Sequence, residues 1–410
     1  MPMLKTTNLA LQGGGAHGAF TWGALDALLA DGRLGFEGIS GTSAGAVNAV
    51  AVAHGWAAAS DAGRDPAEGA RDTLTRVWDQ VMALGALSDG PSRLAKLMLG
   101  ALPGALGRLS PYQSNPLDIN PLRQLLEREI DFERIARLPE PKVFVNATDV
   151  ETGRAVIFAG RRLTAQAVMA SACLPMLFQA PEIDGRAYWD GGYSGNPALA
   201  PLVELCSTRD ILLVQINPLR YPGTPKTAEE IVDRANALTF NASLIAQMRW
   251  VAVLNDMVAK GVAPAGLRAI HMHRIDGGKA MRELPPNSKT NPTRASVQHL
   301  FDLGERAARR WLGRHLVAVG HGSSVKLERD YGDPLRLDYG TLPDEPPGAL
   351  VTVVDPATLW PQDARAAAAA LADEAAHAAT LAAGVRMVPV PDGGDADPAA
   401  DPDANHVPDA

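Results

Sequence analysis

The sequence contains few cysteines, few aromatic residues and no excess of basic residues. Its two cysteines, Cys173 and Cys206, exclude a disulfide framework and a cysteine-rich metal site. Lysine and arginine number 38 against 46 acidic residues, and this net charge of −8 argues against nucleic acid as a partner. Aromatic residues make up only 5%, but the hydrophobic fraction of 46% is too high for a disordered chain. These values predict a soluble globular protein.

Long apolar runs are also missing. The most membrane-like stretch, residues 44–59, consists of small residues, contains Asn48 and His54, and is shorter than the roughly 20 apolar residues that a spanning helix needs. The N-terminus has one lysine and runs into glycines, which is not the pattern of a signal peptide. We therefore expect a cytoplasmic protein with no signal peptide and no transmembrane segment.

The chain divides by composition. We predict a catalytic core over 8–216, an extension over 217–350 that completes or covers it, an alanine-rich helix over 363–383 and a disordered acidic tail over 390–410. Six aspartates and no lysine or arginine fall in 392–410, so most of the net charge belongs to this tail. The rest of the chain is close to neutral.

Strand and helix signals alternate at the start of the chain. Residues 8–12 and 36–40 are short apolar strands, and each is followed by a glycine-containing turn and a helical stretch, 19–30 and 44–59. This order predicts a parallel sheet covered by helices.

The first turn, Gly13-Gly14-Gly15-Ala16-His17-Gly18, matches the pattern of a dinucleotide-binding loop. That function needs an acidic residue at the end of the second strand, but this strand ends at Ser40-Gly41. Consecutive glycines still let backbone N–H groups approach a negative oxygen, either a phosphate or an oxyanion formed in acyl transfer. A tight turn without a ligand is the structural alternative.

The second turn, Gly41-Thr42-Ser43-Ala44-Gly45, lies between a strand and a helix, as a nucleophile elbow does. An ordinary N-cap serine would give the same local pattern. An α/β-hydrolase has several strands before its elbow, whereas only one strand precedes this one. We therefore expect a serine nucleophile on a different fold.

A third turn, Asp190-Gly191-Gly192, supplies a carboxylate that can act as the base. Together the three turns resemble those of the patatin-like phospholipase family, and residues 148–153 and 170–175 resemble its intervening segments. The likeness covers about 8–216. It implies an α/β fold, with a three-layer α/β/α core around a mostly parallel sheet, followed here by the C-terminal helical extension and the tail.

The resemblance also implies a chemistry without metal or cofactor. Ser43 would attack an ester carbonyl and Asp190 would accept its proton, through an acyl-enzyme intermediate. The remaining site residues form the oxyanion hole (Gly13, Gly14, Gly15 and Gly18), the nucleophile elbow (Gly41 and Gly45) and the Asp-Gly-Gly motif (Gly191 and Gly192). The expected substrate is a phospholipid, lysophospholipid or acylglycerol, and no oligomeric state is indicated. An acyl thioesterase or acyltransferase, and a non-catalytic lipid-binding scaffold, are the alternatives.

Two features concern the substrate surface. The family often has arginine at the position of His17, which would contact a lipid head group or pack at the helix start. Residues 91–111 hold Arg93, Lys96 and Arg108 among many leucines and no acid, so they would contact a membrane peripherally or pack on the core. Of the later histidines, His271 and His273 share one strand face and are expected to be structural, with His273 a remote alternative base.

Overall fold

The computed structural model describes residues 4–86, 110–284, 286–289 and 292–332. All of them belong to one structural unit. The alanine-rich helix predicted at 363–383, the acidic tail at 390–410 and nearly all of the basic segment at 91–111 lie outside these ranges.

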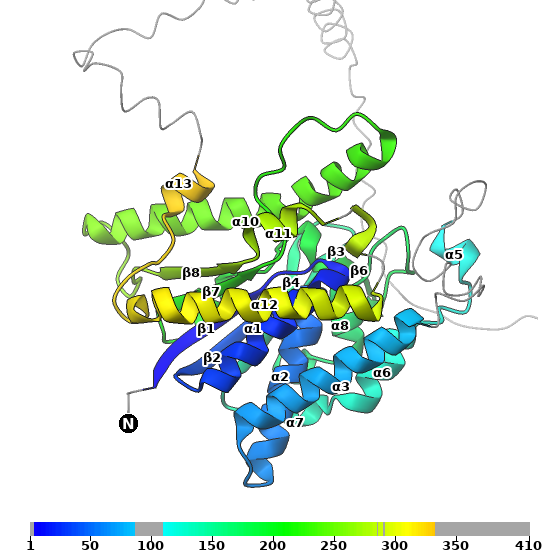
Figure 1. Cartoon of the computed structure of the whole chain (residues 1–410), viewed down its shortest axis with the longest axis horizontal. Coiled ribbons are helices and arrows are strands. Elements are labelled where there is room, and N and C mark those ends of the chain that lie inside the picture. Colours follow the sequence, from blue (N-terminus) through cyan, green and yellow to red (C-terminus); the bar gives the residue numbers. More distant parts are fainter. Residues whose placement is uncertain (1–3, 87–109, 285, 290–291, 333–410) are drawn as a thin grey trace, which may run out of the picture. The chain divides into compact units, whose positions relative to one another are not determined.

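A single eight-stranded sheet forms the centre of the molecule (Figure 1). Its strands are β1 (Lys5–Leu11), β2 (Leu34–Gly41), β3 (Lys142–Asp149), β4 (Ala155–Ala159), β5 (Glu182–Ile183), β6 (Arg186–Asp190), β7 (Asp210–Gln215) and β8 (His271–Asp276). They follow the order β5-β6-β3-β2-β1-β7-β8, with β4 paired to β3. Strands β3, β2, β1, β7 and β8 are parallel to one another. Strands β4 and β6 pair antiparallel with β3, and β5 pairs antiparallel with β6.

The helices follow the strands in the order that the sequence predicts at the start of the chain. They are α1 (Gly18–Asp31), α2 (Ala44–Asp61), α3 (Pro66–Ala86), α5 (Pro111–Ser114), α6 (Pro121–Glu129), α7 (Phe132–Arg137), α8 (Ala165–Ser171), α9 (Ala200–Leu205), α10 (Ala228–Ala259), α11 (Gly278–Arg282), α12 (Arg294–His315) and α13 (Leu327–Tyr331). Short 3-10 turns are η1 (Gly15–His17), η3 (Gly160–Arg162), η4 (Gly191–Tyr193), η5 (Pro286–Lys289) and η6 (Leu316–Ala318).

Successive side chains of the central strands point to opposite faces of the sheet, so these strands contribute to two hydrophobic cores. On β1, Leu9 and Leu11 pack into the larger core with α1, α2, α3 and α12, and Ala10 packs into the smaller core with α9 and α10. On β7, Leu212 and Leu213 divide in the same way. The sheet is therefore covered by helices on both faces, and the α/β/α architecture expected from the sequence is confirmed (Figure 1).

The part of the chain after residue 216 contributes to both layers. Strand β8 extends the sheet beside β7, and α12 packs against α1. The two helices approach closely because each has a glycine at the contact. A Cβ on Gly23 of α1 would collide with the Phe301 carbonyl of α12, and a Cβ on Gly304 of α12 would collide with the Phe20 carbonyl of α1. The described portion of the extension thus completes the sheet and covers it.

Helix α10 is 32 residues long, and its residues 230–259 are long and apolar enough to cross a membrane by length and composition alone. Core helices of globular proteins satisfy the same test. In this fold Leu244, Met248 and Val251 of α10 are buried in the smaller core, so the helix has a packing role on the sheet.

Candidate active site

Ser43 lies in the tight turn between β2 and α2 and has a strained backbone. Its φ of 55° and ψ of −122° fall in a region that favours glycine. The turn is this tight because Gly41 and Gly45 have no side chains: a Cβ on Gly41 would strike the Gly45 carbonyl, and one on Gly45 the Leu11 carbonyl. The Ser43 N–H is held by Ser171 Oγ at 2.9 Å. The strain presents the Ser43 hydroxyl at the carboxyl end of β2.

Asp190 ends strand β6 and is completely buried. Its Oδ1 accepts a 2.7 Å hydrogen bond from Gly192 N, and its own N–H donates to Cys173 O at 2.7 Å. Among the described residues, Oδ2 has no hydrogen-bond partner of normal geometry. One carboxylate oxygen is thus fixed, and the other is left for a proton.

Burial raises the pKa of Asp190 to about 7, although the hydrogen bond from Gly192 and the Ser43 hydroxyl both lower it. Ser43 therefore interacts with this carboxylate, but without the geometry of a full hydrogen bond in this state. Such contacts often tighten only when substrate is bound. A carboxylate with a pKa near 7 is suited to accept the hydroxyl proton and return it.

The glycine turn follows β1, which lies beside β2 in parallel, so the two turns meet at the same edge of the sheet. A Cβ on Gly13 would lie 2.6 Å from Thr42 O and 2.8 Å from Ser43 Cβ, so only glycine lets the chain pass the nucleophile. Within the described part of the chain, Gly14 N, Gly15 N and Ala44 N donate no hydrogen bond. These three N–H groups are available to an oxyanion.

The other two predicted oxyanion residues have different roles. The Gly13 N–H donates to Asn196 Oδ1 at 2.6 Å and is therefore occupied. Gly18 begins α1, and a Cβ there would lie 2.6 Å from Ala44 Cβ, so it permits close packing of α1 on α2. Gly13 and Gly18 therefore allow the close packing of the turn, and both of their N–H groups have partners within the protein.

Comparison with known protein families agrees with the family resemblance that these turns carry. The family model of patatin-like phospholipases matches residues 9–203, which include Ser43, Asp190 and all of the glycine turn. Residues 9–203 form a patatin-like phospholipase domain. No curated protein sequence matches the chain. Among solved structures, the chain is similar to the crystal structure of VipD from Legionella pneumophila, with a TM-score of 0.34 and 16% identity over 75% of this chain and 67% of that chain.

Buried amides join the three turns of the patatin-like domain. Asn196 binds Gly13, and Asn217 Nδ2 donates to Gly13 O at 2.8 Å. Asn146 Nδ2 donates to Gly191 O and Gly195 O, and Thr42 Oγ1 also donates to Gly195 O. The sequence analysis assigned no role to these three asparagines; the one signal in the sequence is the proline that follows Asn196 and Asn217, and Asn146 has none.

His17 is buried in the patatin-like domain, with 4% of its surface exposed. Its Nε2 pairs with Ser288 Oγ at 2.8 Å, and burial, helped by the charge of Lys289, lowers its pKa to about 3. The ring is therefore neutral at physiological pH and covered by η5. Of the two expectations for His17, packing at the helix start fits this environment, whereas head-group contact would need an exposed ring.

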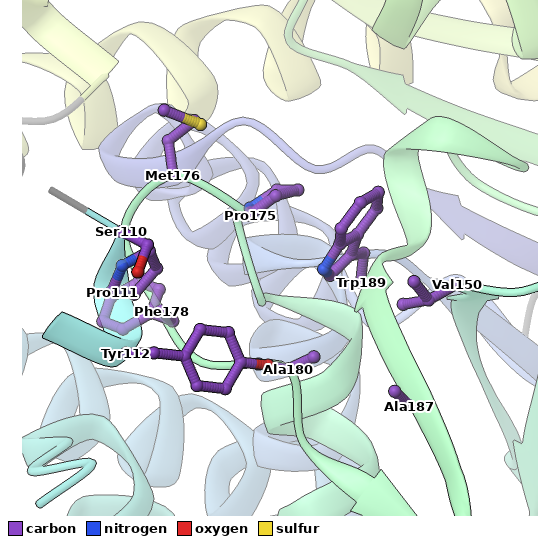
Figure 2. Close-up of a pocket in the computed structure, with 10 residues that line it drawn as sticks. All are labelled: Ser110, Pro111, Tyr112, Val150, Pro175, Met176, Phe178, Ala180, Ala187 and Trp189. Atoms are coloured by element: carbon purple, nitrogen blue, oxygen red, sulfur yellow. The ribbon is translucent and has the colours of Figure 1, made fainter. Parts of the chain in front are cut away.

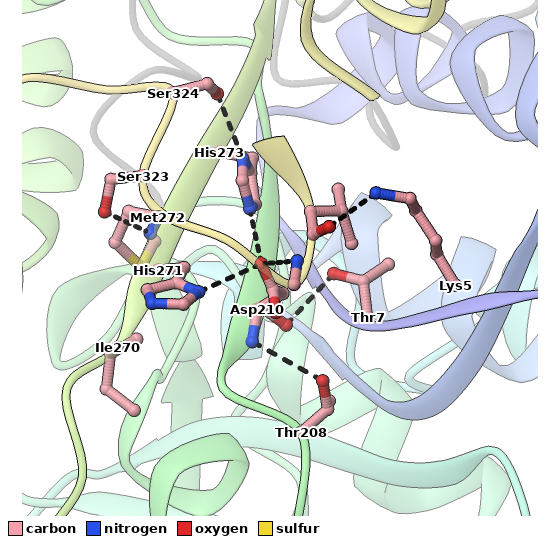
Figure 3. Close-up of polar contacts among 12 residues, drawn as sticks. Lys5, Thr7, Thr208, Asp210, Ile270, His271, Met272, His273, Ser323 and Ser324 are labelled. Atoms are coloured by element: carbon pink, nitrogen blue, oxygen red, sulfur yellow. Dashed lines mark hydrogen bonds and ion pairs between the residues drawn. The ribbon is translucent and has the colours of Figure 1, made fainter. Parts of the chain in front are cut away.

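His273 lies in the first half of β8, next to the amino end of β7, and its polar contacts are drawn in Figure 3. Its Nε2 contacts Asp210 Oδ1 at 2.9 Å and its Nδ1 contacts Ser324 Oγ at 3.0 Å. Asp210 is the first residue of β7, and the glycine turn lies beyond the last residue of that strand. His273 is therefore not placed to act as the base of the patatin-like site. Its contacts with Asp210 and Ser324 fit the structural role that the sequence analysis expects.

Gly13→Ala is expected to lower ester hydrolysis by the patatin-like domain about 100-fold or more. The added Cβ must displace the Ser43 turn, and a shift of about 1 Å in a reacting group can cost that much. The matched control is Gly313→Ala in α12, where nothing lies within 4 Å of the added Cβ. Initial rates on a soluble ester measure both variants, and equal rates for both would contradict this role of Gly13.

Proposed function

We propose that this protein is a serine lipid acyl hydrolase that cleaves carboxylic esters of phospholipids, lysophospholipids or acylglycerols with a Ser43–Asp190 dyad. The observation that carries the proposal is the pairing of a strained serine with a fully buried carboxylate whose pKa is about 7. Membership in the patatin-like phospholipase family supports acyl ester hydrolysis in general.

The chemistry follows from the positions of the groups. Asp190 takes the Ser43 proton while Oγ bonds to the ester carbonyl carbon, whose oxygen becomes negative. The Gly14, Gly15 and Ala44 N–H groups stabilise that oxygen, and the N-terminus of α2 adds its positive dipole end. Protonated Asp190 then gives the proton to the departing alcohol, which leaves an acyl group on Ser43. Water, deprotonated by Asp190, releases the fatty acid.

A lipid panel tests the function. Purified protein is incubated separately with a diacyl phospholipid, a lysophospholipid, a triacylglycerol and an acyl thioester, and the released fatty acid is quantified. We expect release from at least one oxygen ester at a rate above that from the thioester. Preferential cleavage of the thioester would favour the thioesterase alternative, and no release from any substrate by folded protein would favour a lipid-binding scaffold.

The pH dependence of kcat/KM should reveal the pKa of the catalytic base. Because Asp190 acts only when ionised, kcat/KM is expected to rise with pH through a midpoint near 7 and then level off. The neighbouring His17, with a pKa of about 3, adds no second transition in this range. Fatty-acid release measured from pH 5 to 9 checks this, and a flat profile would contradict Asp190 as the base.

A further inference from the structure

The short turn η5 lies directly on the glycine turn of the candidate site. A Cβ on Gly15 would collide with the carbonyl of Lys289, the last residue of η5. Next to it, Ser288 Oγ pairs with His17 Nε2 at 2.8 Å. Gly15 N is one of the N–H groups available to the oxyanion, so Lys289 lies beside the place where an ester carbonyl would bind. It belongs to the extension and is outside the segment that the family model matches.

Lys289 brings a positive charge to this place without a partner for it. Its ammonium makes no ion pair and no hydrogen bond with any residue that the structure describes. The side chain is half-buried, and burial lowers the pKa of Lys289, which the charge of Asp233 on α10 offsets only in part. Buried charges in proteins are normally paired, because an unpaired charge loses its hydration without compensation. A ligand is therefore expected to supply the missing partner.

The glycine turn, residues 13–18, contributes no charge of its own. His17 is its one titratable side chain, and burial, helped by the charge of Lys289, lowers its pKa to about 3, so the ring is neutral. The contact between His17 Nε2 and Ser288 Oγ joins the turn to η5. His17 is thus a positioning residue for η5, and Lys289 supplies the charge.

We propose that Lys289 binds a negatively charged group of the ester that Ser43 cleaves, so that the protein prefers anionic esters to neutral esters with the same acyl chains. This proposal rests on the proposed function and adds a specificity-determining residue to it. The anionic group has to lie within a few bonds of the scissile carbonyl, because Lys289 lies beside Gly15. A phosphate on the alcohol part of the ester has this position, and an ammonium on a flexible stem binds it as a point charge.

Three variants of Lys289 and one control separate the charge from the packing. Lys289→Met removes the charge and keeps a long unbranched side chain, whereas Lys289→Arg retains a charge. The control is Lys279→Met in α11, where the side chain is 78% exposed and pairs with Glu283. All are compared with the wild type by circular dichroism and melting temperature before use, and Lys289→Gln serves if Lys289→Met does not fold.

The readout is the ratio of kcat/KM for dihexanoyl phosphatidic acid to that for dihexanoylglycerol, both below the concentration at which they aggregate. We expect this ratio to fall about tenfold or more in Lys289→Met, to stay within about threefold of the wild type in Lys289→Arg, and to be unchanged in Lys279→Met. A merely structural role of Lys289 would lower the rates on both esters alike and leave the ratio unchanged. An unchanged ratio in Lys289→Met overturns the proposal.

Binding without turnover separates this proposal from the proposed function. Dihexanoyl phosphatidic acid is titrated calorimetrically into Ser43→Ala and into the same variant carrying Lys289→Met, with inorganic phosphate titrated in parallel. We expect the anionic ester to bind about tenfold or more weakly without Lys289. Inorganic phosphate that binds as tightly as the ester, and only when Lys289 is present, would indicate a site for a free anion and overturn the proposal. Binding of the ester that depends on Lys289, in a protein whose wild type hydrolyses neither ester, overturns the proposed function alone.

Discussion

Asp190→Asn is expected to lower ester hydrolysis roughly 10³–10⁴-fold while leaving the fold intact. The asparagine keeps the size of the side chain and still accepts the hydrogen bond from Gly192 N. It has no carboxylate to take the Ser43 proton, and His273, the alternative base suggested by the sequence, is paired with Asp210 at the amino end of β7. Single-turnover measurement of acyl-enzyme formation locates the loss in the proton-transfer step. Near-normal turnover would refute the dyad.

The same substitution is expected to stabilise the protein at neutral and alkaline pH. The pKa of Asp190 is about 7 in the folded protein against a usual value of 3.8, so the folded state favours the protonated carboxyl. Stability is therefore highest below the unfolded pKa and falls as pH rises toward 7, by on the order of 4 kcal/mol once ionisation is complete. Asparagine removes this loss. Denaturant unfolding should show a larger gain at pH 8 than at pH 5.

Asp210→Asn is the matched control for this argument. Asp210 is also buried at a strand end, but hydrogen bonds from His273 and Gly320 outweigh burial and keep its pKa below the usual value (Figure 3). Its ionised form therefore stabilises the fold at neutral pH, and asparagine is expected to lower the free energy of unfolding there. If both substitutions change the free energy of unfolding in the same direction at neutral pH, the account of Asp190 as a carboxylate destabilised by its burial is wrong.

Ser43→Ala is expected to abolish measurable ester hydrolysis, because the other hydroxyl of the turn between β2 and α2, Thr42 Oγ1, is buried and donates to Gly195 O. Alanine has the same unfavourable backbone geometry, so stability should change little. Ser43→Gly should be equally inactive but more stable by about 1–3 kcal/mol, since a φ of 55° costs glycine nothing. Chemical denaturation of the pair separates the strain of the turn from the loss of the nucleophile. Equal stability of the two variants would mean that the turn stores no strain.

The parts of the site that the sequence predicts are those encoded locally. Each strand–turn–helix unit of the first half is continuous in the chain, so its glycine spacing and apolar periodicity are visible without a structure. Outside the site, the cap of α6 is also encoded locally: Asn120 directly precedes Pro121 in the sequence, and Asn120 Oδ1 accepts a hydrogen bond from Leu122 N. The adjacency of β1 and β2 then brings the two glycine-containing turns together.

The parts that escape prediction depend on contacts between distant segments. Asn196 removes the Gly13 N–H from the set of oxyanion donors across 183 residues of sequence. The pairing of β6 with β3, which places Asp190 beside the site, is antiparallel and has no local signal. Likewise an apolar pocket lined by Tyr112, Phe178 and Trp189 is assembled from α5, the segment 173–180 and β6, and these residues resemble ordinary core residues when each segment is taken alone (Figure 2).

Labelling with a fluorophosphonate probe, followed by mass spectrometry of the modified peptide, tests the central claim most directly. The probe reacts with a serine only where a base and an oxyanion site activate it. We predict a single adduct on Ser43 in the wild type, far slower labelling in Asp190→Asn and none in Ser43→Ala. An adduct on a different serine, or folded wild-type protein that stays unlabelled, would contradict the assignment of Ser43 and Asp190 as the catalytic pair.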